Sequence, residues 1–171
     1  MPNLDARVRT VEEHVRRENE HDLARLMKTF SDADAHFDDE PWDEHSLGHD
    51  QVRAFYEALF HAIPDLHIDV RGRHVSEDAI TLEVVISGTH QGTWRGLPGT
   101  GRRLEYPLCA IFTFDEQDCV TGEKVYYDRA TVLRQVGLFH EPLSWAGRVV
   151  LPLTHPATMA RAVGRTLFRR Q

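Results

Sequence analysis

The hydrophobic pattern changes its period part-way along the chain, and this change constrains the fold more than any other feature. Up to Pro64, apolar residues recur every three or four positions, as in amphipathic helices. From Asp65 onward they alternate with polar residues, as in strands. Helices followed by consecutive antiparallel strands predict an α+β fold, in which the helices cover one face of a curved sheet. A chain of 171 residues is long enough for one core of this kind.

Three helices are predicted before the change of period. Val8, Val11 and Val15 place an apolar stripe on a helix over residues 5–19, and Asp22 is the expected N-cap of a second helix. A short polar strand near residues 35–38 and a loop over 39–48 follow. The third helix ends at Pro64 and carries these apolar residues on one face: Val52, Phe55, Tyr56, Leu59 and Ile63.

Four strands and a short helix are predicted after Pro64. The first strand has Leu66, Ile68 and Val70 on one face, and the next alternates from residue 80 to 86. Residues 104–114 are apolar at nearly every position from 108 on, which is typical of a strand covered on both faces. A last strand over 120–127 leads to a helix over 129–136, for which Asp128 is the expected N-cap and Gly137 the end.

The composition excludes several classes of protein. Hydrophobic residues make up 41% and charged residues 27%, which is typical of a globular chain. The net charge of −7 argues against nucleic acid as a partner. No apolar run approaches the roughly 18 residues of a membrane span, and the N-terminus lacks the apolar core of a signal peptide. With only two cysteines, no disulfide framework is expected, so we expect a reduced, cytoplasmic protein.

The charge is unevenly distributed, because residues 142–171 carry five arginines and no acid while the remainder has a charge of −12. A helix is predicted from Pro156. We therefore divide the chain into a domain over 1–137 and a basic extension over 138–171. This extension either docks on the acidic domain or a second subunit, which we favour, or lies on an anionic membrane surface. Its helix would carry an apolar and a basic stripe: Met159, Val163 and Leu167, and Arg161, Arg165 and Arg169.

Two stretches are more specific. The first, GTHQGTWRGLPGTGRR (88–103), is the predicted hairpin between two long strands, and the second, EKVYYDRATVLRQVG (123–137), spans the last strand and the short helix. In this order, after three helices, they resemble the SnoaL-like polyketide cyclase family, over roughly residues 7–137. The resemblance implies the nuclear-transport-factor-2-like fold, a cone-shaped sheet around a small-molecule cavity. It also implies cofactor-independent cyclase or isomerase chemistry on a polyketide-like molecule, and a homodimer.

The resemblance also implies where chemistry is expected in the family. The acid/base aspartate of characterised cyclases lies nine residues before the Arg of the Leu-Arg-Gln run, and this position is Val125 here. A histidine and a glutamine of the neighbouring strand correspond to Ala110 and Leu108. Any acid/base group must therefore stand elsewhere. The side chains expected to line the cavity are Trp42, Phe55, Leu59, Trp94, Tyr106, Leu108, Ala110 and Val125.

Strand parity suggests a replacement for the aspartate. Glu123, Val125 and Tyr127 share one face of the last strand, because side chains alternate along a strand. If Val125 faces the cavity, Glu123 and Tyr127 do also. A carboxyl group among apolar neighbours has a raised pKa, which suits general acid/base catalysis. Alternatively, Glu123 lies at the rim and pairs with Arg102 or Arg103.

Three further residues are candidates for catalysis. His90 matches a histidine of the family's hairpin motif, and it either hydrogen-bonds a substrate carbonyl or holds the hairpin. His36 and Asp38 are two residues apart on the first predicted strand and could form a histidine–carboxylate base. Alternatively, these two lie on a solvated strand edge within an acidic stretch.

Other chemistries find less support in the sequence. His36, Asp38, His45 and His49 do not form a tight metal-ligand pair, so we expect no metal and no cofactor. Neither a nucleophile elbow nor an Asp–Arg–Asp hydrolase arrangement is recognisable. We expect an enzyme in which Glu123 or the His36–Asp38 pair removes a proton next to a carbonyl. His90 and Tyr127 would then hydrogen-bond the enolate. The alternative is a binding protein of the same fold that has lost the acid/base group.

Overall fold

The computed structural model describes residues 3–141 and 144–168. It contains six strands and six α-helices, with short 3-10 turns at Met27–Thr29 and Glu40–Trp42. In chain order the helices and strands are α1 (Leu4–Asn19), α2 (Leu23–Leu26), β1 (His36–Asp39), β2 (Glu44–Leu47), α3 (His49–Ala62), β3 (His67–Val75), β4 (Ala79–Thr89), β5 (Arg103–Phe114), β6 (Val120–Tyr127), α4 (Arg129–Gln135), α5 (Trp145–Thr154) and α6 (Pro156–Phe168).

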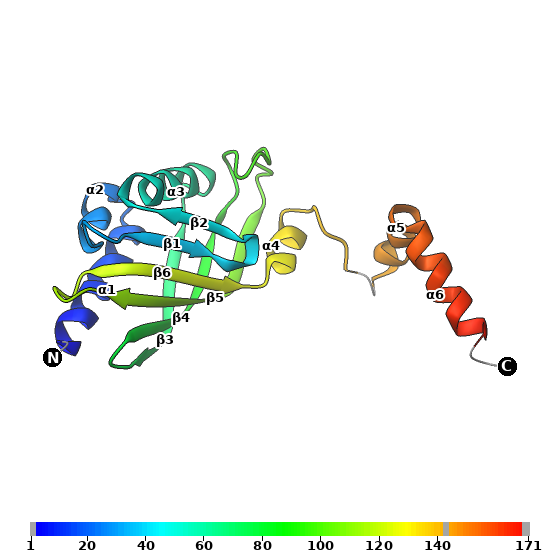
Figure 1. Cartoon of the computed structure of the whole chain (residues 1–171). Coiled ribbons are helices and arrows are strands. Elements are labelled where there is room, and N and C mark those ends of the chain that lie inside the picture. The colour runs from blue at the N-terminus through cyan, green and yellow to red at the C-terminus, as the bar shows by residue number, and fades with distance from the viewer. Residues whose placement is uncertain (1–2, 142–143, 169–171) are drawn as a thin grey trace.

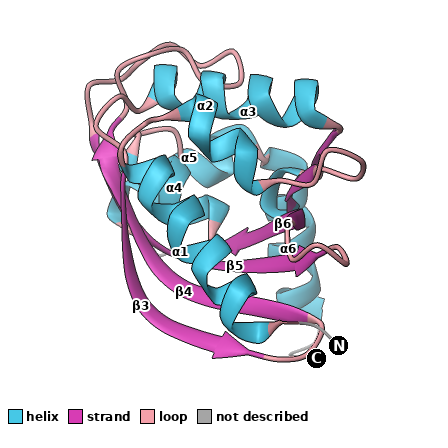
Figure 2. Cartoon of the chain, turned by 90° about the vertical axis from the view of Figure 1, so that its left-hand side faces the viewer, coloured by secondary structure: helices cyan, strands magenta, loops and turns pink. Residues whose placement is uncertain are grey.

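The strands form one curved sheet in the order β2-β1-β6-β5-β4-β3. Long β3 and β4 bend around α1, and α3 lies along the opposite side of the concave face (Figures 1 and 2). A register shift between Val70 and Gly72 interrupts the β3–β4 ladder, and such bulges bend a strand. The predicted α+β cone is therefore confirmed.

The sheet differs from the prediction at its β1–β2 end. β1 pairs antiparallel with β2 but parallel with β6, so the sheet is mixed rather than purely antiparallel. The loop expected over 39–48 contains β2, a strand that was not predicted. β2 reads Glu-His-Ser-Leu and has no apolar alternation; its pairing with β1 defines it as a strand.

The predicted helix caps are confirmed. The Asp22 carboxylate accepts a hydrogen bond from the backbone N–H of Arg25. The Asp128 carboxylate accepts from Ala130 and Thr131 at the start of α4. Each such cap contributes about 1 kcal/mol to stability, and the cap on α4 fixes the end of β6, the strand that carries Glu123.

Beyond α4 the chain leaves the cone. α5, which was not predicted, packs against α6, and Figure 1 shows the two helices apart from the sheet. The side chain of Trp145 at the start of α5 is 83% exposed. Docking of residues 138–171 on the cone stays a prediction, and the side chains of Val163, Leu167 and Arg169 in the predicted stripes lie outside the described residues. Within the described ranges no helix combines the length and apolar character that crossing a membrane requires.

Candidate functional site

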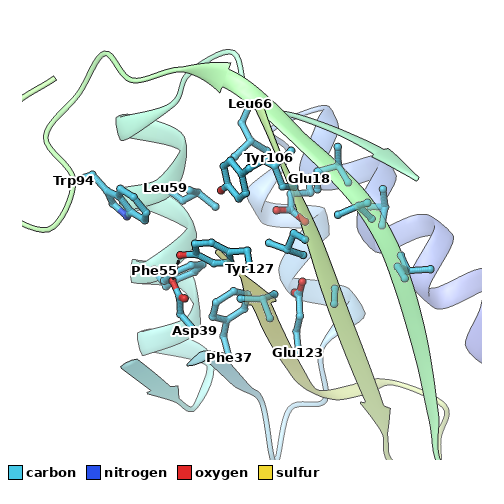
Figure 3. Close-up of a pocket in the computed structure, with 18 residues that line it drawn as sticks. Glu18, Phe37, Asp39, Phe55, Leu59, Leu66, Trp94, Tyr106, Glu123 and Tyr127 are labelled. Carbon is cyan, nitrogen blue, oxygen red and sulfur yellow. Dashed lines mark hydrogen bonds between the residues drawn. The ribbon is translucent and has the colours of Figure 1, made fainter. Parts of the chain in front are cut away.

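A cavity lies in the concave side of the sheet, between the strands and helices α1 and α3 (Figure 3). The space between its atoms, open solvent at the mouth included, is about 600 Å³, and the part that the centre of a water-sized sphere can occupy is about 50 Å³. Most of its wall is apolar, as in small-molecule sites generally. Of the side chains expected to line it, the structure places these along the wall: Phe55, Leu59, Trp94, Tyr106, Leu108, Ala110 and Val125. The remaining one, Trp42, packs edge-on against Trp94, with ring centroids 5.7 Å apart.

Glu123 faces this cavity together with Val125 and Tyr127, as strand parity predicts. Its side chain is buried, and it does not pair with Arg102 or Arg103 at the rim. Instead, the Tyr56 hydroxyl on α3 donates a hydrogen bond to Glu123 Oε2 over 2.5 Å, and His14 Nε2 on α1 lies 3.1 Å from the same oxygen. Three elements therefore hold one carboxyl group in an apolar environment.

The hydrogen bonds around His14 fix its tautomer. The Thr29 hydroxyl donates its only proton to the carbonyl oxygen of Leu26 at 2.7 Å, so it accepts from His14 Nδ1–H at 2.8 Å. Tyr56 has already donated its proton to Glu123. The Tyr56 hydroxyl lies 3.2 Å from His14 Nε2, and Glu123 Oε2 lies 3.1 Å from it. The hydrogen bond between His14 Nε2 and Glu123 Oε2 requires one proton, which the two residues share.

Glu18 is a second buried carboxyl group at this end of the cavity. It lies one turn after His14 on α1, lines the cavity and is only 7% exposed. No described residue hydrogen-bonds its carboxyl group; the nearest titratable nitrogen, His14 Nε2, lies 3.8 Å from Glu18 Oε2, beyond hydrogen-bond distance. Burial, reinforced by the charge of Glu123, raises the pKa of Glu18 well above its usual value. We call Glu18 and Glu123 the carboxyl pair.

The carboxyl pair and His14 also have the spacing of a cation site. One donor atom from each residue lies within 4.8 Å of the other two. The hydrogen bonds of Glu123 Oε2 with Tyr56 and His14 already explain why His14 and Glu123 lie so close together. The geometry therefore provides a proton-sharing cluster without requiring an ion.

The other end of the cavity lies beside the hairpin that joins β4 and β5. We call it the hairpin end, and it consists of Asp39, Trp94, Arg95 and Tyr127. Asp39 Oδ2 accepts hydrogen bonds from Arg95 Nη2 at 2.6 Å and from the Tyr127 hydroxyl at 3.0 Å. Asp39 is 2% exposed, and its Oδ1 has no hydrogen-bond partner among the described residues. Burial raises the pKa of Asp39, although the Arg95 charge opposes the shift.

Arg95 is held in place from several sides. Its guanidinium lies 4.8 Å from the ring centre of Trp42 and 4.9 Å from that of Trp94, within cation–π range. It also forms an ion pair with Glu44 on β2. The hairpin end is therefore anchored by β1, β2, β6 and the hairpin together.

The expected placement of His36 and Asp38 in the cavity was wrong. β1 includes Asp39, and it is Phe37 and Asp39 that face the cavity. Asp38 lies on the opposite face, where it contacts His45 Nδ1 at 2.8 Å and Lys124 Nζ at 3.6 Å. The inward face of this strand could not be predicted from the sequence, because acidic residues occupy both of its faces.

His90 is fully buried inside the hairpin and is not among the residues along the cavity. Its Nδ1 lies 3.2 Å from the Thr100 hydroxyl and accepts a longer hydrogen bond from the Thr100 backbone N–H. Burial lowers the pKa of His90, which favours the neutral ring. This placement corresponds to the structural role considered for His90, in which the ring holds the hairpin.

Five polar residues of the site were not predicted from the sequence: His14, Glu18, Asp39, Tyr56 and Arg95. One signal was available for Glu18, since it continues the spacing of Val8, Val11 and Val15 on the apolar face of α1. A glutamate in that stripe indicates a buried carboxyl group. Its proximity to Glu123 depends on the packing of α1 against the sheet.

Residues 6–136 match the SnoaL-like polyketide cyclase family. The chain belongs to this family. No curated protein matches it in sequence. The same fold is found in the structure of AclR, a putative hydroxylase from Streptomyces galilaeus. AclR is 24% identical in sequence to this chain, and the two structures superpose with a TM-score of 0.69. The match covers 81% of this chain and 100% of the AclR chain.

Two further structures share the fold. One, from Catenulispora acidiphila, has a ketosteroid isomerase-like fold; it is 19% identical, with a TM-score of 0.65, and covers 75% of this chain and 92% of its own. The other is the epoxide hydrolase/cyclase-like enzyme SalBIII, which has a role in pyran ring formation in the polyether salinomycin. It is 16% identical, with a TM-score of 0.65, and covers 77% of this chain and 97% of its own.

Proposed function

We propose that this SnoaL-like protein is a cyclase or isomerase that uses acid/base chemistry on an apolar, oxygenated, polyketide-like molecule. The observation that supports it best is the buried Glu123 carboxyl group, which faces an apolar cavity and shares a proton with His14. A buried carboxyl group costs stability unless its partners compensate for the lost water, so an incompletely paired one indicates a function. Glu123 Oε1 accepts no hydrogen bond from the described residues and is available to a ligand.

In the proposed reaction Glu123 acts as the general base. Its carboxylate removes a proton from a carbon next to a carbonyl, and the C–H electron pair forms the enolate. For a cyclisation, the enolate carbon bonds to a second carbonyl carbon of the same molecule. The proton then returns to the new alkoxide oxygen, so the product is an isomer of the substrate. Loss of that hydroxyl group with a neighbouring proton gives a product lighter by one water.

His14 and Tyr56 assist Glu123 in different ways. The shared proton between His14 Nε2 and Glu123 Oε2 lets the imidazole accept or return a proton as Glu123 changes its ionisation. The Tyr56 hydroxyl, which donates to the same oxygen, fixes the carboxyl plane. Thr29 in turn orients the imidazole through Nδ1. Glu123 is therefore positioned without the aspartate that the resemblance to characterised cyclases implies at the position of Val125.

A binding protein without catalysis is the second candidate. It is favoured by the apolar side chains of Leu108, Ala110 and Val125, which line the cavity where the family resemblance expects polar catalytic groups. The hydrophobic wall would bind the same class of ligand. A homodimer, which the family resemblance implied, belongs to either proposal.

Mass spectrometry of turnover over a panel of polyketide-derived esters and ketones separates the two candidates. Thermal shifts are recorded on the same samples. A product that is isomeric with its substrate, or lighter by one water, supports the enzyme. Raised melting temperatures with no product anywhere in the panel contradict catalysis and support the binding protein.

A further inference from the structure

The carboxyl pair is asymmetric, although both groups line the same part of the cavity. Glu123 Oε2 has two hydrogen-bond partners, Tyr56 and His14. Glu18 has none among the described residues, yet it is more than nine-tenths buried and faces the cavity. Two carboxyl groups whose environments differ in this way take different protonation states, and such pairs assign acid and base roles.

The surroundings of Glu18 favour its neutral form. No arginine or lysine pairs with it within the described ranges, and its nearest titratable neighbours are His14 on its own helix and Glu123 on β6. Tyr106 of β5 lines the same cavity, and burial, followed by the charges of Asp39 and Glu18, raises the pKa of Tyr106. An anion at Glu18 would thus meet a second carboxyl group and apolar walls. A neutral carboxyl group has one O–H donor, and no described acceptor takes it.

We infer that Glu18 is a protonated hydrogen-bond donor for a carbonyl oxygen of the ligand, with Glu123 facing the carbon next to that carbonyl. This inference rests on the proposed function and narrows its substrate class to ketones and esters with an enolisable carbon. The donor oxygens of the carboxyl pair lie within 4.8 Å of each other. One small group can therefore contact both, with negative charge developing on the oxygen that Glu18 holds.

Infrared spectroscopy of the protein without ligand tests the protonation state independently of turnover. At pH 7 we expect a C=O stretch of a neutral carboxyl group that shifts in D₂O, disappears in Glu18→Gln and persists in Glu123→Gln. Asp39→Asn is the control, because Asp39 is the other buried carboxyl group in the cavity. A band that is unchanged in Glu18→Gln, or no band in the intact protein, overturns the inference.

Acetophenone labelled with ¹³C at its carbonyl carbon tests the ligand class. The bound ketone should show a lowered carbonyl stretch in the intact protein and in Glu18→Gln, whose amide still donates, but not in Glu18→Leu. If the carbonyl stretch of the bound ketone is lowered in Glu18→Leu as much as in the intact protein, the inference is overturned. Tight binding of one Zn²⁺ ion per chain, lost in His14→Ala, also overturns it, because a cation would hold Glu18 ionised.

Turnover then distinguishes this inference from the proposed function. If a substrate is found, Glu18→Leu should lower kcat by about 100-fold, the typical cost of removing one donor to a developing oxyanion. Glu18→Gln should lower kcat by a smaller factor, because its amide still donates a hydrogen bond. A neutral Glu18 with no turnover on any ketone contradicts the proposed function alone. Turnover that needs Glu123 but is unchanged in Glu18→Leu contradicts the inference alone.

Discussion

The two ends of the cavity bury carboxyl groups in opposite ways. At the hairpin end, Asp39 has a guanidinium partner, which is itself held between Trp42 and Trp94. At the carboxyl pair, Glu123 has neutral or proton-sharing partners and Glu18 has none. A fixed cation compensates a buried anion permanently, whereas a shared proton allows the charge to change. This difference indicates that the hairpin end binds and orients the ligand, while the carboxyl pair moves protons.

The largest effect is expected from Glu123→Gln. The amide has a similar shape but cannot accept a proton, so kcat should fall by about 10²–10⁴-fold, the usual contribution of a general base. The thermal shift caused by ligand should persist. Turnover measured by mass spectrometry checks this prediction, with Glu105→Gln, an exposed glutamate on β5, as the matched control. Full activity in Glu123→Gln would place the base elsewhere.

A smaller effect is expected from Asp39→Asn. Asp39 Oδ1 is buried without a partner, so a ligand hydroxyl group can donate to it. Loss of that hydrogen bond to a charged group should raise KM by about tenfold, corresponding to about 1.4 kcal/mol, with a smaller change in kcat. Steady-state kinetics check the split between KM and kcat. Glu40→Gln, a neighbouring acid that pairs with Lys124, is the control. A fall in kcat with unchanged KM would mean that both ends take part in the chemistry.

Stability should respond to Glu18→Gln in a pH-dependent way. The pKa of Glu18 is raised by burial above its usual value of 4.5, so above that pH the folded protein retains a proton that the unfolded chain releases. The free energy of unfolding therefore falls as pH rises towards the folded-state pKa. Glutamine does not ionise, so Glu18→Gln removes this fall in the free energy of unfolding. At pH 8 its Tm should therefore be higher, by about 2–4 °C for each kcal/mol by which the free energy of unfolding increases.

Calorimetric unfolding at pH 5 and pH 8 checks this prediction. The gain in Tm should be smaller at pH 5, where both states hold more of the proton. Glu105→Gln should show no comparable pH dependence, because its side chain is exposed. A Tm that falls at both pH values would indicate that Glu18 is ionised and supports the fold.

The smallest functional effect is expected from His90→Ala. The ring is buried and contacts Thr100 within the hairpin, so its loss should lower Tm through missing hydrogen bonds worth about 1 kcal/mol. Because His90 is not along the cavity, kcat should change little. Calorimetry and turnover on the same preparation check both parts. A large loss of kcat at unchanged Tm would restore the catalytic role considered from the sequence.

Local patterns predicted much of the fold and part of the site. The spacing of Val8, Val11 and Val15 predicted α1, and the alternation from Asp65 predicted β3 and β4. Parity along β6 also predicted that Glu123 and Tyr127 share the face of Val125, because side-chain direction in a strand follows directly from sequence position. These features depend on neighbours along the chain, so the sequence alone determined them.

Contacts between distant elements were decided only by the tertiary structure. β2 has no apolar alternation and is a strand because it pairs with β1, and the parity of β1 was unreadable because its polar residues occupy both faces. The environment of Glu123 requires His14 from α1 and Tyr56 from α3, residues 109 and 67 positions away. The sequence determined which titratable side chains are present. Only packing decided that Asp39 has a cationic partner, that Glu123 shares a proton and that Glu18 has no hydrogen-bond partner among the described residues. Burial and charge pairing depend on neighbours in three dimensions, which lie far apart in the sequence.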